Sequence, residues 1–173
     1  MTNLGARAGL ALAAVAAVAG LAVAAAFAGP NGSGNGTACV FNTKLSPANE
    51  IRPAGTPDPV ESTASGHAQI KVRNDGTIEF KYRIRNPGSE MFQAGHIHAA
   101  PATASGGIVV DLLAPPALGT ATNAERFGDS GVGVPRATAP ANIAQLICEH
   151  PENYYVNLHT TADPQGAIRG QLG

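Results

Sequence analysis

The feature that most restricts the fold is a pair of alternating segments joined by a turn signal, GHAQIKVRN and TIEFKYRIR around the dipeptide Asp75-Gly76. In the second segment Ile78, Phe80, Tyr82 and Ile84 alternate with charged residues. A period of two predicts a strand with one buried face. Asn-Asp-Gly between two such segments predicts a tight antiparallel hairpin. We expect the charged face of this hairpin to be solvated.

More segments of strand type occur along the chain, separated by Gly, Pro, Asn and Asp. They are ACVFNTKL, AGHIHAA, GIVVDLLAP, NYYVNLHT and GAIRGQL. The glycine-rich residues 125–134 are expected to pair only partly. After residue 38, helical spacing of apolar residues occurs only in residues 141–149. The pattern predicts an all-β fold, an antiparallel Greek-key sandwich or barrel with one short helix near 141–149.

The chain begins with the features of a secretory signal. Residues 1–28 contain one charge, Arg7, then an Ala/Leu/Val segment and a final Ala-Phe-Ala. We expect signal peptide cleavage near Ala28, a flexible linker over 29–37 and a β domain over 38–173. The protein would then be secreted or periplasmic. The alternative is an uncleaved leader that anchors the protein in a membrane, because its apolar segment is just long enough to span one.

The remaining composition narrows the classes of function. With 11 basic and 12 acidic residues and no basic cluster in the sequence, the chain offers no electrostatic reason to bind nucleic acid. Contact with a membrane is expected only through an uncleaved leader. Both cysteines, Cys39 and Cys148, follow the leader, and an oxidising compartment favours a disulfide between them. Two buried free thiols are the alternative. No phosphate-cradling loop and no nucleophile motif occurs.

The last two strand segments predict the surroundings of His159. The sequence DPQG, which begins at Asp163, is typical of a type I turn with a bulge. That turn would place Gln171 directly opposite His159. The even-numbered residues of both strands then form an apolar face and the odd-numbered residues a polar face. We therefore expect His159 and, diagonally from it, Arg169 on the face away from the core.

In GHIHAA the side chains of His96 and His98 share one face of a strand, and the residue between them faces the core. If this strand lies beside the one that carries His159, three imidazoles and the guanidinium of Arg169 converge. Neutral imidazoles bind copper, zinc or nickel. Arg169 would then attract an anionic substrate. His67 lies on the polar face of its own strand and is a candidate fourth ligand.

A structural interpretation of the same residues is open as well. The two histidines of GHIHAA would then hydrogen-bond to loop backbone, and His159 and Arg169 would orient the last hairpin through Asn157 or Glu50. Glu50 is expected to form a salt bridge with Arg169 or Arg52.

Four motifs, PANEIRP, GHIH followed by GGIVVDL, YYVNLHT and DPQGAIRGQL, occur in this order over about residues 40–173. Together they resemble the chordin-type domain, CHRD. The resemblance implies an extracytoplasmic, immunoglobulin-like or barrel-like β domain, found in the secreted growth-factor antagonist chordin and in bacterial exported proteins. The first hypothesis is therefore a binding or structural module without a cofactor, whose partner is an extracytoplasmic protein or a small ligand.

A more distant similarity is to copper-zinc superoxide dismutase, a Greek-key β-barrel. That family binds copper through an H-x-H strand and a later strand histidine, and a following arginine guides the anion. His96, His98, His159 and Arg169 occur here in the same order. The metal-bridging histidine and the zinc loop are missing. The second hypothesis is therefore a copper-only protein with these three histidines as ligands, in which Arg169 would assist superoxide chemistry.

Overall fold

The computed structural model describes residues 36–56, 60–113, 125–127 and 136–173. The expected leader and nearly all of the expected linker lie outside these residues, as does most of the glycine-rich segment at 125–134. Within the described part of the chain, no helix is long and apolar enough to cross a membrane.

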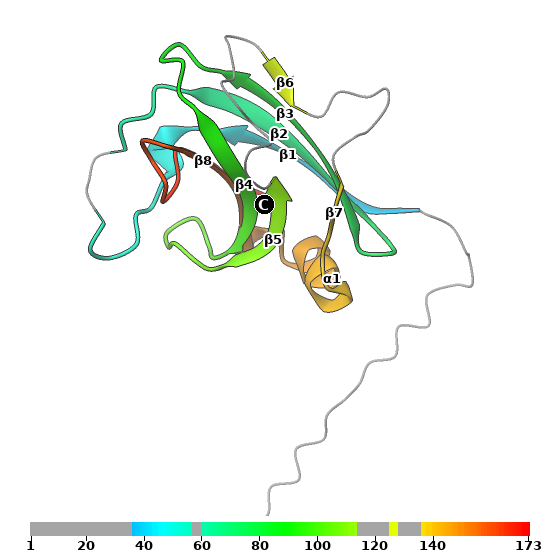
Figure 1. Ribbon diagram of the computed structural model, residues 1–173. Coiled ribbons are helices and arrows are strands. Elements are labelled where there is room, and N and C mark those ends of the chain that lie inside the picture. Colours follow the sequence, from blue (N-terminus) through cyan, green and yellow to red (C-terminus); the bar gives the residue numbers. More distant parts are fainter. Residues whose placement is uncertain (1–35, 57–59, 114–124, 128–135) are drawn as a thin grey trace, which may run out of the picture. The chain divides into compact units, whose positions relative to one another are not determined.

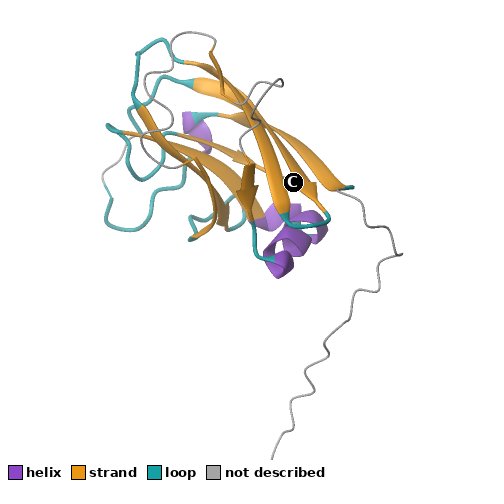
Figure 2. Ribbon diagram, turned by 45° about the vertical axis from the view of Figure 1, so that its right-hand side comes forward, coloured by secondary structure: helices purple, strands orange, loops and turns teal. Residues whose placement is uncertain are grey.

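The described strands form two antiparallel sheets that face each other (Figures 1 and 2). One sheet has the order β1-β2-β3-β6, with β7 also paired to β3, and the other has the order β5-β4-β8-β9. The strands are β1 (Thr37–Leu45), β2 (Ser65–Arg73), β3 (Thr77–Arg85), β4 (Phe92–Ala99), β5 (Ile108–Leu113), β6 (Glu125–Phe127), β7 (Arg136–Thr138), β8 (Tyr154–Thr160) and β9 (Ile168–Gln171). The helical elements are α1 (Ala141–Glu149) and the 3-10 turns η1 (Pro47–Asn49) and η2 (Pro151–Asn153). The expected all-β sandwich with a helix at 141–149 is confirmed.

The hairpin of β2 and β3 follows its sequence pattern. Val72 pairs with Ile78 next to the turn. At the turn Gly76 has a φ of 81°, a left-handed conformation that suits glycine, and the Asp75 side chain accepts a hydrogen bond from the Thr77 amide at 2.9 Å. The apolar residues of β3 are buried between the sheets, while Arg83 and the other residues of the charged face remain partly or largely exposed.

The core lies between the two sheets, because each sheet turns its apolar face inward. Its largest fully buried apolar side chains are Tyr82, Phe80, Phe92, Leu45, Ile70, Ile78, Ile84, Ile97, Ile147, Leu158 and Ile168. Beside the core, β1 and β9 meet through a single bridge, in which Ser46 and Arg169 exchange backbone hydrogen bonds of 3.0 and 3.2 Å. The sandwich is therefore joined along this edge.

The last hairpin has the predicted faces but not the predicted pairing. Leu158 pairs with Ile168 and both lie in the core, while Asn157 pairs with Arg169 on the opposite face. Gln171 lies opposite Tyr155. The prediction that Gln171 lies opposite His159 is therefore wrong, although even-numbered residues do face even-numbered ones.

The reason lies in the loop between β8 and β9. The predicted turn is present, since the Gly166 amide donates to the carbonyl of Asp163 at 3.1 Å and Gly166 has a φ of 131°. Asp163, however, is buried and ion-paired with Arg52, and its amide donates to the Thr160 hydroxyl at 3.0 Å. The ladder of β8 and β9 ends at the pair Leu158 and Ile168, and the Thr160 amide donates to the carbonyl of Asp163 at 3.3 Å. The loop is therefore longer than the turn alone.

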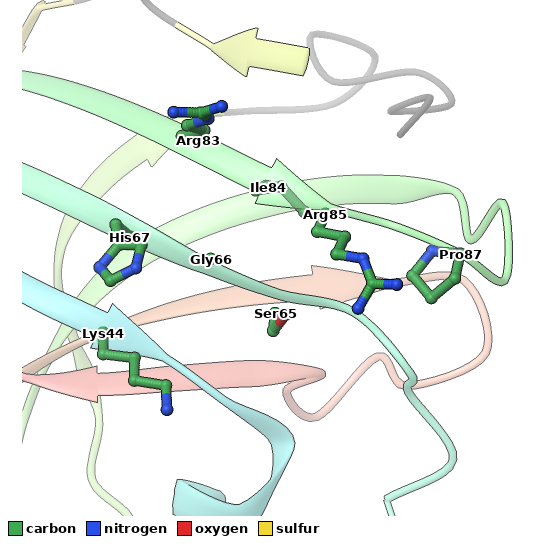
Figure 3. A pocket seen from close by; sticks show the side chains of 8 residues that line it. All are labelled: Lys44, Ser65, Gly66, His67, Arg83, Ile84, Arg85 and Pro87. Carbon is green, nitrogen blue, oxygen red and sulfur yellow. The ribbon is translucent and has the colours of Figure 1, made fainter. Parts of the chain in front are cut away.

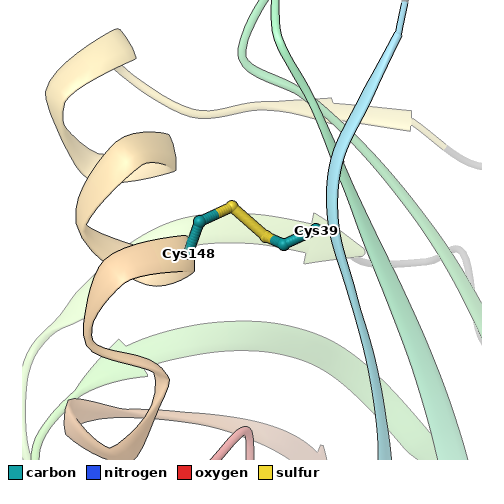
Figure 4. The surroundings of a disulfide bond; sticks show 2 residues. All are labelled: Cys39 and Cys148. Carbon is teal, nitrogen blue, oxygen red and sulfur yellow. A yellow bond between two sulfur atoms is a disulfide. The ribbon is translucent and has the colours of Figure 1, made fainter.

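The expected disulfide is confirmed. Cys39 of β1 is bonded to Cys148 of α1, with 5.7 Å between their Cα atoms (Figure 4). The helix buries Ala144 and Ile147. The bond therefore fixes this helix to the first strand of the five-stranded sheet, and the alternative of two free thiols is excluded.

Candidate metal centre

Strand β4 lies between β5 and β8, and this arrangement assembles the histidines. His96 pairs with Asn157 and His98 with Tyr155, while His159 pairs with Ala94 across a local irregularity in the ladder. His159 is thus a diagonal neighbour of His96 on the same face. The residue between the two histidines of β4 is fully buried in the core, as predicted. The strand adjacency that the histidine cluster requires is therefore present.

The three imidazole rings are in close contact. Ring centroids are 4.6 Å apart for His96 and His159, 5.5 Å for His96 and His98, and 5.6 Å for His98 and His159. One nitrogen from each ring can be chosen so that all three lie within 4.8 Å of one another. His98 and His159 are buried and His96 is half-buried.

Backbone carbonyls fix two of the rings. The Nδ1 of His98 lies 2.9 Å from the carbonyl oxygen of Gly106, and the Nδ1 of His159 lies 3.1 Å from that of Pro164. A carbonyl oxygen only accepts hydrogen bonds, so in both rings the proton is on Nδ1 and the lone pair is on Nε2. Metal-binding histidines are oriented by hydrogen bonds of this kind from the nitrogen that does not bind the metal.

The remaining ring, that of His96, contacts the ring of His159. The Nδ1 of His96 lies 2.9 Å from the Nε2 of His159, and the Nε2 of His96 lies 3.5 Å from a carboxylate oxygen of Asp111. Because the Nε2 of His159 carries a lone pair, His96 donates a hydrogen bond to it from Nδ1. If the proton moves to the Nε2 of His96, the Asp111 carboxylate is placed to accept a hydrogen bond from that nitrogen. Three lone pairs would then converge.

Tyr155 and the segment at 100–107 cover this face of the sheet. The Tyr155 ring stacks on His98 with centroids 4.9 Å apart, and its hydroxyl accepts a hydrogen bond from the Gly106 amide at 3.2 Å. Residue 106 must be glycine, because a Cβ there would lie 2.0 Å from the carbonyl oxygen of Ala99. The same close approach brings the Gly106 carbonyl to His98.

Arg169 holds the covering segment, residues 100–107, through hydrogen bonds to its backbone. Its guanidinium donates to the carbonyl oxygens of Ala104 at 2.8 Å and Pro101 at 2.9 Å, and to the Gln171 side chain at 3.1 Å. It also lies over the Tyr155 ring, 3.5 Å from its centroid. Arg169 is 2% exposed. These contacts occupy the guanidinium. They therefore favour a structural role for Arg169 over the guiding of an anion.

Two other expectations need correction. His67 is exposed on β2, in the other sheet, and is not part of the cluster. Glu50 accepts a hydrogen bond from the Asn157 side chain at 3.3 Å, whereas Arg52 forms its ion pair with Asp163. The expected Glu50–arginine salt bridge is therefore replaced by an amide contact.

Several contributors to the cluster were not predicted from the sequence. Asp111 reaches His96 because irregularities on both sides of this position set the register of β4 and β5. The carbonyls of Gly106 and Pro164 belong to loops, whose conformation has no sequence period. Tyr155 alone carried a signal, since it shares the odd-numbered face with His159.

Burial keeps the three imidazoles neutral. It lowers the pKa of His96 and of His98, and it lowers the pKa of His159 from 6.5 to about 4, with His96 contributing further. At neutral pH the lone pairs are therefore not lost to protons. The Nε2 of His98 is buried and has no hydrogen-bond partner among the described residues. A metal ion would satisfy this atom, so the residues fit a metal ligand set.

His159, which is buried, and Glu50, which is half-buried, give opposite dependences of stability on pH. The lowered pKa of His159 means that the unfolded chain takes up a proton first, so stability is lost as pH falls from 6.5 towards 4. Burial raises the pKa of Glu50 from 4.5 to about 7, against the lowering effects of Arg169 and Asn157. Its contribution is complete below pH 4.5 and is lost as pH rises through 7.

We therefore expect Glu50→Gln to expose the histidine effect. Between pH 6.5 and 4.5 the stability of this variant should fall by about 2 kcal/mol more than that of the wild type, because the variant lacks the opposing group. Chemical denaturation in a metal-free buffer at several pH values measures the difference. His159→Gln serves as the control and should change the slope in the other direction. Parallel profiles for Glu50→Gln and the wild type would contradict the assignment.

The fold and the cluster define a class: a disulfide-bonded antiparallel β sandwich that carries a covered group of histidines on one sheet. The chain belongs to the CHRD family, because the model of the CHRD domain matches residues 41–172. CHRD domains are extracellular β modules, and the disulfide is consistent with that setting. No curated protein and no solved structure matches the chain.

Proposed function

We propose that this protein is an extracytoplasmic copper-binding β domain. Its ligands are the Nδ1 of His96, the Nε2 of His98 and the Nε2 of His159. The observation that carries the proposal is the convergence of one nitrogen from each ring to within 4.8 Å, while the remaining nitrogens face two carbonyls and a carboxylate.

A purely structural network explains this arrangement less well. Burying a polar atom without a hydrogen bond costs about 1–3 kcal/mol, and the Nε2 of His98 is in that position among the described residues. The hydrogen bond between His96 and His159 also occupies the Nε2 lone pair of His159, which would otherwise be available to a metal ion. A bound cation would satisfy both atoms, with the proton of His96 on its Nε2, where the Asp111 carboxylate would accept the hydrogen bond.

Copper is the metal that this ligand set favours. Imidazole nitrogens suit copper, zinc and nickel, and among these divalent ions copper binds nitrogen ligands most tightly. Ligand bonds of about 2 Å require the nitrogens to be at most about 4 Å apart. The cluster would therefore contract by about 1 Å or more from its present 4.8 Å span. That is a side-chain adjustment.

Copper bound by three imidazoles would supply one-electron redox chemistry in an oxidising compartment. We do not extend the proposal to superoxide chemistry, because Arg169 is held by the carbonyls of Pro101 and Ala104. A role as a binding or structural module is compatible with the copper site and stays a proposal of its own, since the histidines occupy only one of the two sheets.

Copper titration of the purified, disulfide-bonded protein tests the proposal. The wild type should retain one copper per chain against a competing chelator, with nitrogen couplings in its electron paramagnetic resonance spectrum. His96→Ala/His98→Ala removes two of three ligands and should weaken binding by roughly 100-fold or more.

The matched control is His67→Ala/His150→Ala, which removes the only two histidines outside the cluster. Both of these residues are exposed. The control should bind copper like the wild type. Failure of the wild type to retain copper at micromolar concentration, or an equal loss in the control, would overturn the proposal.

A further inference from the structure

The outer face of the five-stranded sheet carries a row of basic side chains. The histidine cluster lies on the other sheet. Lys44 of β1 pairs with His67 of β2, which in turn pairs with Arg83 of β3. Arg85 follows on the same face of β3, opposite Ser65. The sequence predicted only a solvated face on β3. The strand register adds Lys44 and His67 to it.

These side chains line a pocket of about 590 Å³ (Figure 3). Its wall is completed by Ser65, Gly66, Ile84 and Pro87. No acidic residue is among the lining residues, so nothing in the wall itself neutralises the three cations. Pockets that hold small organic molecules in proteins have volumes of about 300–1,000 Å³. The pocket is therefore large enough for more than an inorganic ion.

The other end of the same face is arranged differently. There Lys71 pairs directly with Glu79, with 3.8 Å between their charged atoms, and Arg73 reaches the same carboxylate at 2.7 Å. Asn42 and Gln69 hydrogen-bond to each other between the strands. On this face of β2 and β3, the basic side chains near the turn are thus neutralised by a carboxylate. Those at the opposite end are not.

Among the residues that the structure describes, Lys44, Arg83 and Arg85 form no ion pair with a carboxylate. Lys44 and Arg83 lie on either side of β2, and Arg85 is two residues from Arg83 on the same face, so like charges are gathered there and repel one another. A general excess of basic residues does not explain the row, because the whole chain has a formal net charge of −1. An uncompensated row of this kind that also lines a pocket is the arrangement that an anionic ligand requires.

We infer that this pocket binds a phosphate-bearing anion with at least two negative charges. Arg83 and Arg85 can each donate paired hydrogen bonds to phosphate oxygens, Lys44 supplies a point charge, and the Ser65 hydroxyl is a neutral donor. The phosphate can belong to a small organic molecule or to a lipid headgroup, and the test below separates these sources. The site is independent of the copper proposal, because it lies on the other sheet.

Pyrophosphate is the probe for the free ligand, and vesicles that contain cardiolipin, whose headgroup carries two phosphates, are the probe for a headgroup. In metal-free buffer at low salt, millimolar pyrophosphate should raise the melting temperature of the wild type and bind with measurable heat. Lys44→Gln/Arg83→Gln should weaken that binding at least tenfold, because two of three cations are lost. Without ligand the double variant should melt at the same temperature as the wild type or above it, because the repulsion among the cations of the pocket is reduced.

The control is Lys81→Gln, which removes a cation from the same face of β3 but outside the pocket. It should bind pyrophosphate like the wild type. Vesicle binding that the double variant loses and the control keeps would also support the site and assign it to a headgroup. Absence of binding to both probes, or equal losses in the control and the double variant, would overturn the inference.

Discussion

Removal of the Cys39–Cys148 disulfide is expected to lower the free energy of unfolding by roughly 5 kcal/mol. The bond spans 109 residues of sequence, and a cross-link that closes so long a loop removes much of the conformational entropy of the unfolded chain. A typical domain has a total stability of about 5–15 kcal/mol, so the reduced protein should be close to unfolding. Cys39→Ser/Cys148→Ser, compared with the wild type by chemical denaturation, measures the loss.

A reducing agent supplies the control for this prediction. It should destabilise the wild type as much as the double substitution does, and it should leave the double variant unchanged, because the described residues contain no free cysteine. A loss below about 2 kcal/mol would contradict the prediction, because a cross-link that closes a loop of this length should restrict the unfolded chain by more.

Replacement of Arg169 by methionine is expected to cost about 3–5 kcal/mol. The substitution keeps much of the apolar stem but removes three hydrogen bonds from a buried charged group, and bonds of this type contribute about 1.5–3 kcal/mol each. Part of this loss is offset, because the variant no longer buries a charge. It also leaves the carbonyls of Pro101 and Ala104 without their donor. Denaturation of Arg169→Met against the wild type measures the change in stability.

The same variant should affect the histidine cluster. Arg169 holds the segment whose Gly106 carbonyl orients His98, so hydrogen exchange in residues 100–107 should become faster and copper binding weaker by roughly tenfold or more. Arg169→Lys retains the charge and one donor group, and it should fall between the methionine variant and the wild type. A methionine variant with unchanged exchange in this segment would contradict the proposed positioning role.

The elements that were predictable from the sequence are those with a local period or a local turn. Alternation identified the β2–β3 hairpin, and the parity of odd and even residues placed His159 and Arg169 on one face of β8 and β9. Parity is unaffected by a shift of an even number of residues. The faces were therefore correct although the pairing was not.

The elements that were not predictable depend on contacts between distant segments. The ion pair of Arg52 with Asp163 joins residues 111 positions apart, and it holds the loop that connects the two strands of the last hairpin. The contact between His96 and His159 requires β4 to lie beside β8, which is 63 positions away along the chain. No local pattern reports such neighbours. The position of the covering segment, residues 100–107, over Tyr155 could not be predicted from the sequence for the same reason.

The position of the disulfide divides the chain into a covalent ring and a tail. Residues 39–148 are closed by the bond, whereas β8 and β9 follow it and, apart from the main chain itself, are held to the ring by noncovalent contacts. His96 and His98 belong to the ring, and His159 belongs to the tail. In the proposed copper-bound state, the metal would therefore act as a second cross-link that fastens the tail to the ring. Release of copper would loosen the last two strands while the disulfide stays intact.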